Sequence, residues 1–148
     1  MNNSVVNVPI PINEPIKDYK PNSPEKDSVL ATYKNLNNST TDVKMWIGGK
    51  FVESSKTSNM SPPHDHKHIL GKYYLAEKKH VKMAIKSALD AKEKWAGMRW
   101  EERAAIFLKA AELVAGPYRD RINAATMLAQ SKTIFQAEID AACELVDF

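Results

Sequence analysis

The sequence predicts a mixed α/β chain, in which an extended N-terminal arm precedes a short antiparallel β-hairpin, a further strand and four α-helices. Three observations lead to this prediction. Five of the eight prolines fall within residues 1–41. Two adjacent glycines separate two short β-forming runs, and apolar residues recur at helical spacing from residue 77 onward. We therefore divide the chain into an arm, residues 1–41, and a second part, residues 42–148.

Composition excludes several classes of protein. The net charge of +3 in 148 residues is too small to indicate a polyanionic partner, and one Cys cannot form a disulfide within the chain. No apolar run reaches the roughly 18 to 20 residues of a membrane-spanning helix. The five glycines are too dispersed for a glycine-rich phosphate loop. The first residues resemble neither a secretory signal nor an Arg-rich transit peptide. We therefore expect a cytoplasmic protein, with the mitochondrial matrix as the alternative.

One short helix is predicted within the arm. Its N-cap is Ser23, and Pro24 follows at a position where the missing N–H costs nothing. The side chains expected to dock this helix are Val29, Leu30 and Tyr33. Because residues 35–40 form a polar run, the helix is predicted not to continue through them.

The hairpin is predicted over residues 45–60. Its strands are the β-forming runs 45–47 and 51–52, and the two glycines between them suit a two-residue turn with positive φ. A further strand is predicted over residues 69–75, before the helical pattern begins.

Four helices are predicted in the second part, over residues 77–95, 100–115 and 118–129, with a capping box at Thr133 beginning the fourth. Gly97 is predicted to cap the first of them. The residues expected to point inward are Ile106, Ala110, Leu113 and Val114 in the second helix and Ile122, Ala125 and Leu128, or their neighbours, in the third.

The fourth helix is apolar on two faces. One face holds Phe135, Ile139, Ala142 and Val146, and the other holds Ala137, Ala141 and Phe148. Such a helix requires cover on two sides, yet the sequence stops at Phe148 without a capping residue or a polar tail. We therefore expect the N-terminal piece of a longer protein. The alternative is a small helical module that binds a partner through this helix and performs no catalysis.

Alternating histidines form one candidate metal site. His64, His66 and His68 would share one face of an extended strand and could hold zinc or nickel. Lys67 would repel a cation, and no Cys lies nearby. A polar surface loop is therefore the preferred interpretation, and no metal is expected.

The lysines around the first long helix could form a nucleic-acid surface. Lys78, Lys82 and Lys86 line one face of that helix, but no aromatic ladder accompanies them. We interpret this face as a solvated helix surface and expect no nucleic-acid partner.

Two neighbouring residues of the last helix, a cysteine and a glutamate, have side chains that could take part in chemistry. Cys143 lies deep in the helix beside Glu144, and a negative neighbour raises a thiol pKa, so an inert packed thiol is expected rather than a nucleophile. Glu144 has the small apolar neighbours Ala137 and Ala141. On this pattern alone a solvated helix face is the preferred interpretation, and a carboxylate that lines the wall of a cleft is the alternative.

Several segments together resemble a known family. Residues 102–112 and the following Ala115-Gly116-Pro117-Tyr118-Arg119 are similar to the aldehyde dehydrogenase superfamily. Residues 136–148 narrow the resemblance to the members that act on 1-pyrroline-5-carboxylate. Residues 14–19 and 47–50 fit the same group, so the resemblance covers nearly the whole chain.

The resemblance implies both a fold and a reaction. Residues 42–148 would form an incomplete part of the cofactor-binding domain of an α/β enzyme. The implied reaction, in proline degradation, oxidises L-glutamate γ-semialdehyde, formed when the cyclic imine opens with water, to L-glutamate. A cysteine thiolate attacks the aldehyde and NAD⁺ accepts the hydride. The family also implies a homo-oligomer.

The same resemblance limits which residues can act. In this family the nucleophile, the general base and the dinucleotide-binding fold come later in the chain. No catalytic or cofactor-binding residue is therefore expected here, and these 148 residues alone should be inactive. The family does place a glutamate at the position of Glu144, where it borders the aldehyde pocket, and we carry that role to Glu144.

Overall fold

Helix α1 (Pro24–Asn37) is the first regular element of the computed structural model, which describes residue 5 and residues 7–148. The predicted N-cap is confirmed, because the Ser23 hydroxyl accepts a hydrogen bond from the Lys26 N–H at 3.4 Å. Val29 is buried as expected, whereas Leu30 is exposed. The predicted end of the helix is wrong. The helix continues because Leu36 lines an apolar hollow against neighbouring elements.

The predicted hairpin forms from β2 (Met45–Ile47) and β3 (Lys50–Val52). The strands are antiparallel, and Ile47 pairs with Lys50 across the two-residue turn. Both turn glycines have positive φ angles, 60° and 76°, which side chains with a Cβ rarely adopt. The turn chemistry that predicted this hairpin is therefore confirmed.

A second, three-stranded sheet differs from the prediction. Its central strand, β5 (Gly71–Tyr74), confirms the strand predicted over residues 69–75. β1 (Thr41–Val43) pairs with β5 in parallel, and β4 (Thr57–Met60) pairs with it antiparallel. The prediction of one hairpin over residues 45–60 is therefore wrong at its end. β4 leaves the hairpin because its partner is β5 rather than β3.

The first three predicted helices are confirmed as α2 (Lys78–Gly97), α3 (Trp100–Ala115) and α4 (Arg119–Gln130). Gly97 is not the cap of α2, however. It is the last helical residue, and Met98 caps the helix from an extended conformation with φ −69°. Among the residues that the structure describes, no helix is both long enough and apolar enough to cross a membrane.

The predicted fourth helix is a composite of three segments. It begins with α5 (Ile134–Ala137), where Thr133 and Gln136 form the predicted capping box. A π-helix, η1 (Glu138–Cys143), follows, and α6 (Glu144–Asp147) completes it. The prediction of one regular α-helix is therefore wrong over residues 138–143. A cluster of buried polar groups accompanies the change of helix type.

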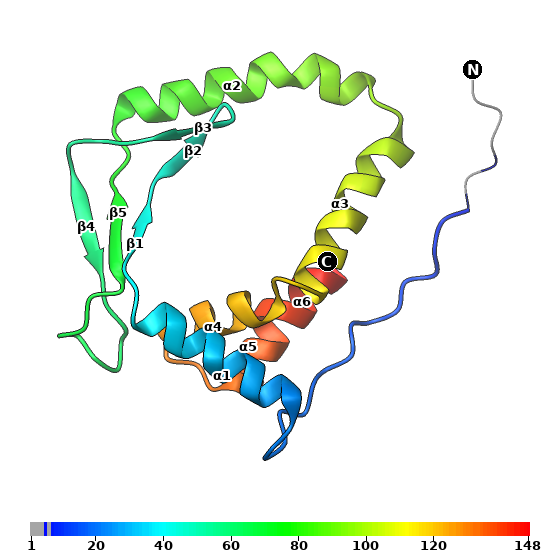
Figure 1. Cartoon of the computed structure of the whole chain (residues 1–148). Coiled ribbons are helices and arrows are strands. Elements are labelled where there is room, and N and C mark those ends of the chain that lie inside the picture. The colour runs from blue at the N-terminus through cyan, green and yellow to red at the C-terminus, as the bar shows by residue number, and fades with distance from the viewer. Residues whose placement is uncertain (1–4, 6) are drawn as a thin grey trace.

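Figure 1 shows α2 and α3 as an arch that joins the sheets to a cluster of α1, α4, α5, η1 and α6. α1 packs against α4, and α4 packs against α5 and η1. Most of the buried side chains therefore lie in this cluster, and α3 contacts it through α4, η1 and α6.

The arch helices leave their apolar residues exposed. The prediction that α3 points Ile106, Ala110 and Leu113 inward is wrong for this chain, and Ile106 is 50% exposed. In α4, Leu128 is buried as predicted, whereas Ala125 is exposed. The main contacts of α3 are with α4, η1 and α6, and they leave Ile106 exposed.

Candidate functional site

A buried ion pair lies at the centre of the helix cluster. Arg119 begins α4 and Glu138 begins η1, and these residues are only 2% and 0% exposed. Arg119 Nη2 lies 2.5 Å from Glu138 Oε1, and Arg119 Nε lies 3.2 Å from both carboxylate oxygens. Removing both charges from water is costly, so such a pair requires further hydrogen bonds to offset that cost.

The Glu138 carboxylate receives those additional bonds from three residues, two in the arm and one in α4. The Tyr19 hydroxyl donates to Oε2 at 2.7 Å, and Asn123 Nδ2 donates to the same oxygen at 2.7 Å. The Lys17 backbone N–H donates to Oε1 at 2.8 Å. Hydrogen-bond donors therefore surround the Glu138 carboxylate. The sequence of this helix does not indicate that the carboxylate is buried.

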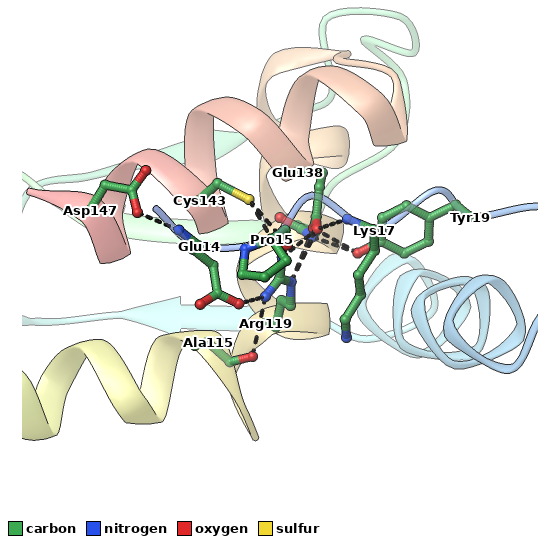
Figure 2. Close-up of polar contacts among 10 residues, drawn as sticks. Glu14, Pro15, Lys17, Tyr19, Ala115, Arg119, Glu138, Cys143 and Asp147 are labelled. Atoms are coloured by element: carbon green, nitrogen blue, oxygen red, sulfur yellow. Dashed lines mark hydrogen bonds and ion pairs between the residues drawn. The ribbon is translucent and has the colours of Figure 1, made fainter. Parts of the chain in front are cut away.

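Arg119 is enclosed in the same way by acceptors, as Figure 2 shows. Its guanidinium pairs with the Glu14 carboxylate and donates to the Pro15 carbonyl at 2.7 Å. Two further contacts reach the Ala115 carbonyl at 3.5 Å and Cys143 Sγ at 3.4 Å. The guanidinium therefore joins the arm to three helical segments.

The electrostatics of the cluster favour the charged pair. Burial alone would raise the pKa of the Glu138 carboxyl, but Arg119 and the donors around it hold that pKa below its ordinary value. Burial likewise acts against the charge of Arg119, yet its bonds to Glu138 and Glu14 raise the pKa of the guanidinium. Burial and the neighbouring Glu138 raise the pKa of Tyr19. The tyrosine therefore remains a neutral donor.

The arm lies along the last helical segments. Its Lys17 N–H and Tyr19 hydroxyl reach Glu138 at the start of η1, and its Glu14 N–H donates to Asp147 Oδ1 at 2.7 Å near the end of α6. The sequence predicts only an extended arm for this proline-rich segment, so this contact is not predicted from it. The available signal was the presence of an acidic and an aromatic residue among the prolines.

Cys143 is the packed thiol that the sequence predicted. It is buried at the end of η1, and burial raises the pKa of the thiol. The thiol also lies 3.9 Å from the Pro15 carbonyl. A group in this environment is a poor nucleophile at neutral pH.

Glu144 is exposed at the first residue of α6, directly after the buried Ala142 and Cys143. Its backbone N–H bonds to the Ile139 carbonyl, five residues earlier, as in a π-helix. The α-helical spacing that placed Ala137 and Ala141 beside Glu144 is therefore wrong. Single π-helical turns often occur at functional sites, because the added residue redirects the side chains that follow.

The three histidines lie in a loop with two turns and do not share the face of a strand. His64 Nδ1 lies 2.7 Å from the Ser131 hydroxyl, and His68 Nε2 lies 2.8 Å from the Asn37 carbonyl. The two imidazoles therefore bond to different helix ends. Over residue 5 and residues 7–148, no group of three or more His, Cys, Asp or Glu side chains could hold a metal ion.

The lysine stripe is a solvated surface of α2. Lys78, Lys82 and Lys86 are exposed, and Lys86 Nζ pairs with Asp90 one turn later at 2.6 Å. Such exposed pairs contribute little to stability.

An apolar hollow of about 460 Å³ lies between α1, the three-stranded sheet and α4. Leu36, Val43, Met60 and Leu128 are among its lining residues. A smaller hollow of about 260 Å³ lies beside Asp42. Neither hollow includes Glu138 or Glu144, so the polar cluster and these hollows are separate.

Comparisons with known proteins give a consistent result. Residues 51–148 match the aldehyde dehydrogenase family. A probable delta-1-pyrroline-5-carboxylate dehydrogenase of Schizosaccharomyces pombe is 42% identical over 92% of this chain, and the mitochondrial enzyme of that type from Homo sapiens is 39% identical over 92%. These matches cover 25% and 24% of those two proteins, so the chain spans about a quarter of their length.

A solved structure supports the same relationship. The delta-pyrroline-5-carboxylate dehydrogenase from Mycobacterium tuberculosis, bound with NAD, superposes with a TM-score of 0.96 at 41% identity. The match covers 99% of this chain and 28% of that chain.

Proposed function

This chain belongs to the aldehyde dehydrogenase family, and from this premise we propose that it forms the N-terminal quarter of an enzyme that oxidises L-glutamate γ-semialdehyde to L-glutamate. The reaction consumes water and one NAD⁺ and releases NADH. The observation that carries the proposal is the similarity, over nearly the whole chain, to enzymes named for the cyclic form of this substrate.

The exposed apolar side chains of α2 and α3 support the proposal that further residues of the enzyme cover these helices. Val81, Ile85 and Phe107 lie on α2 and α3 and are each more than half exposed. Large exposed apolar side chains on neighbouring elements are typical of a surface that another part of a protein covers. We propose that the remainder of the enzyme packs here. A self-contained interaction module would use the same surface for a partner, but the family match includes both helices and favours the enzyme.

The residues present do not fit NAD. A dinucleotide site needs a glycine-rich turn that opens a helix after a strand. In the part of the chain that the structure describes, the glycines lie in the hairpin turn, in β5 and at the ends of α2 and α3. We therefore propose that NAD is bound outside these 148 residues.

We propose that Glu144 borders the aldehyde pocket of the complete enzyme. Its exposure and its position directly after a π-helical turn support this role. Glu144→Ala in the full-length enzyme should change the KM for the semialdehyde and its selectivity over aldehydes without a carboxylate. Unchanged turnover and unchanged selectivity would remove the assignment.

Two further properties follow from the family and remain proposals. We expect the complete enzyme to be a homo-oligomer, which analytical ultracentrifugation would test. We expect a cytoplasmic location, with the mitochondrial matrix as the alternative because the similar human protein is named mitochondrial. Fractionation of the source cells would separate the two.

The function itself is tested by following NADH formation. The full-length enzyme should reduce NAD⁺ with L-glutamate γ-semialdehyde, and residues 1–148 alone should be inactive. A full-length enzyme that oxidises only aldehydes lacking the α-amino acid group would overturn the substrate assignment.

A further inference from the structure

The arm contacts the last helix on both sides of its π-helical turn. At the start of η1, the Tyr19 hydroxyl and the Lys17 N–H bond to Glu138. Beyond the turn, the Glu14 N–H bonds to Asp147 in α6. Figure 2 shows these arm groups lying alongside the helix, so η1 is held between two fixed points.

The π-helical turn decides where Glu144 points. Each residue of an α-helix advances the side-chain direction by about 100°. A π-helical turn contains one more residue than an α-helical turn, so the positions after it are rotated by about that amount relative to a regular helix. Glu144 is the first residue after η1 and its N–H closes the last π-type bond, to Ile139. Loss of the π-helical turn would therefore turn the Glu144 carboxylate to another face.

The π-helical geometry needs support from outside the helix. Isolated π-helices are rare, because the α-helix is the better hydrogen-bonded alternative. Arg119 and the arm supply that support, because they fix the buried carboxylate of Glu138, the first residue of η1. If residues 138–143 became α-helical, the residues after Glu138 would rotate about the helix axis. The bond between the Glu14 N–H and Asp147 would then be lost.

We propose that the arm segment Glu14–Tyr19 holds residues 138–143 in the π-helical register and thereby positions Glu144 in the aldehyde pocket. Tyr19 is then a positioning residue that acts through Glu138, although it lies 125 positions before Glu144 in the sequence. The inference rests on the proposed role of Glu144, and it adds a residue of the arm as a determinant of aldehyde binding.

The test is a double-mutant cycle in the full-length enzyme. Tyr19→Phe removes the hydroxyl that bonds to Glu138 but keeps the ring. It should raise the KM for the semialdehyde about three- to tenfold, with kcat and the KM for NAD⁺ unchanged within about twofold. In the Glu144→Ala background the same change should have no further effect. The matched control is Ser28→Ala, which removes an exposed hydroxyl contact between α1 and α4, to Asp120, and should alter none of these values.

The outcomes separate the two proposals. If the enzyme oxidises the semialdehyde but Tyr19→Phe has the same effect with and without Glu144, the function stands and the positioning role is refuted. A general loss of kcat and of NAD⁺ binding would also refute it, because that pattern indicates a structural role. If no semialdehyde is oxidised, the function fails on its own.

Amide hydrogen exchange tests the positioning without any activity. Tyr19→Phe should speed exchange at the Glu144 N–H, which closes the π-type bond, and Ser28→Ala should not. Unchanged exchange at that amide in Tyr19→Phe would overturn the inference.

Discussion

The Arg119 guanidinium and the Glu138 carboxylate form an ion pair inside the helix cluster, with their closest atoms 2.5 Å apart. The two residues are 19 positions apart and begin α4 and η1. Because both are also bonded to the arm, this pair joins three segments that are remote in the sequence. The structure of the chain around Glu144 depends on this ion pair.

Removal of one partner of the pair should be strongly destabilising. Arg119→Met leaves the Glu138 carboxylate buried without a counter-charge, and we expect a loss of about 3–5 kcal/mol in the free energy of unfolding. The double variant Arg119→Met with Glu138→Leu should recover part of this loss. Urea unfolding of the full-length enzyme measures both. As a control, Lys86→Ala breaks an exposed pair and should cost at most about 0.5 kcal/mol. Equal losses for Arg119→Met and Lys86→Ala would contradict the buried pair.

The lowered pKa of Glu138 predicts a pH dependence of stability. The folded state keeps the carboxylate charged below its ordinary pKa of 4.5, whereas the unfolded chain takes up a proton there. The contribution of Glu138 is therefore complete above about pH 4.5 and is lost as the pH falls through the lower folded-state pKa. Urea midpoints measured from pH 6 downward should fall less steeply for Glu138→Gln than for the unmodified protein. Parallel curves would mean that Glu138 does not contribute.

Cys143 should react slowly while the protein is folded. Burial raises the pKa of its thiol, and the helix cluster blocks access to the sulfur. We expect alkylation by iodoacetamide at pH 8 to be about a hundredfold or more slower in the native full-length enzyme than in urea. Peptide mass analysis would follow residue 143 by itself. Similar rates in the two conditions would show that the thiol is accessible.

Gly71 is expected to be indispensable for the three-stranded sheet. A Cβ at this position would lie 1.9 Å from the Thr41 carbonyl oxygen, and the φ angle is 149°. Gly71→Ala should therefore break the pairing of β1 with β5 and cost about 2–4 kcal/mol. Gly97→Ala is the matched control, because a Cβ there meets no atom within 4 Å and a helical alanine should add up to about 1 kcal/mol. Thermal unfolding would reveal the difference, and a Gly71→Ala protein as stable as Gly97→Ala would contradict this account.

Sequence analysis succeeded where the signal is local. The Ser23 cap, the capping box at Thr133 and the glycine pair of the hairpin each depend on neighbouring residues, and each is confirmed. Residues 57–60 and 41–43 carry no such signal. They become strands because they meet β5, which is a contact between distant segments.

The polar cluster could not be predicted for the same reason. A carboxylate such as Glu138 is normally exposed, and only the arrival of Arg119 and the arm makes its burial tolerable. Residues 138–143 form a π-helix, so the predicted α-helical placement of Ala137 and Ala141 beside Glu144 is wrong. The role of Glu144 in the pocket came from the family resemblance and stays a prediction.

The most direct test of the proposed function is the stoichiometry of the complete enzyme. Purified full-length protein is incubated with L-glutamate γ-semialdehyde and NAD⁺, and the NADH and L-glutamate formed are both quantified. One NADH and one L-glutamate should form for each semialdehyde consumed, with no product when NAD⁺ is omitted. Consumption of the semialdehyde without equal amounts of NADH and L-glutamate would contradict it.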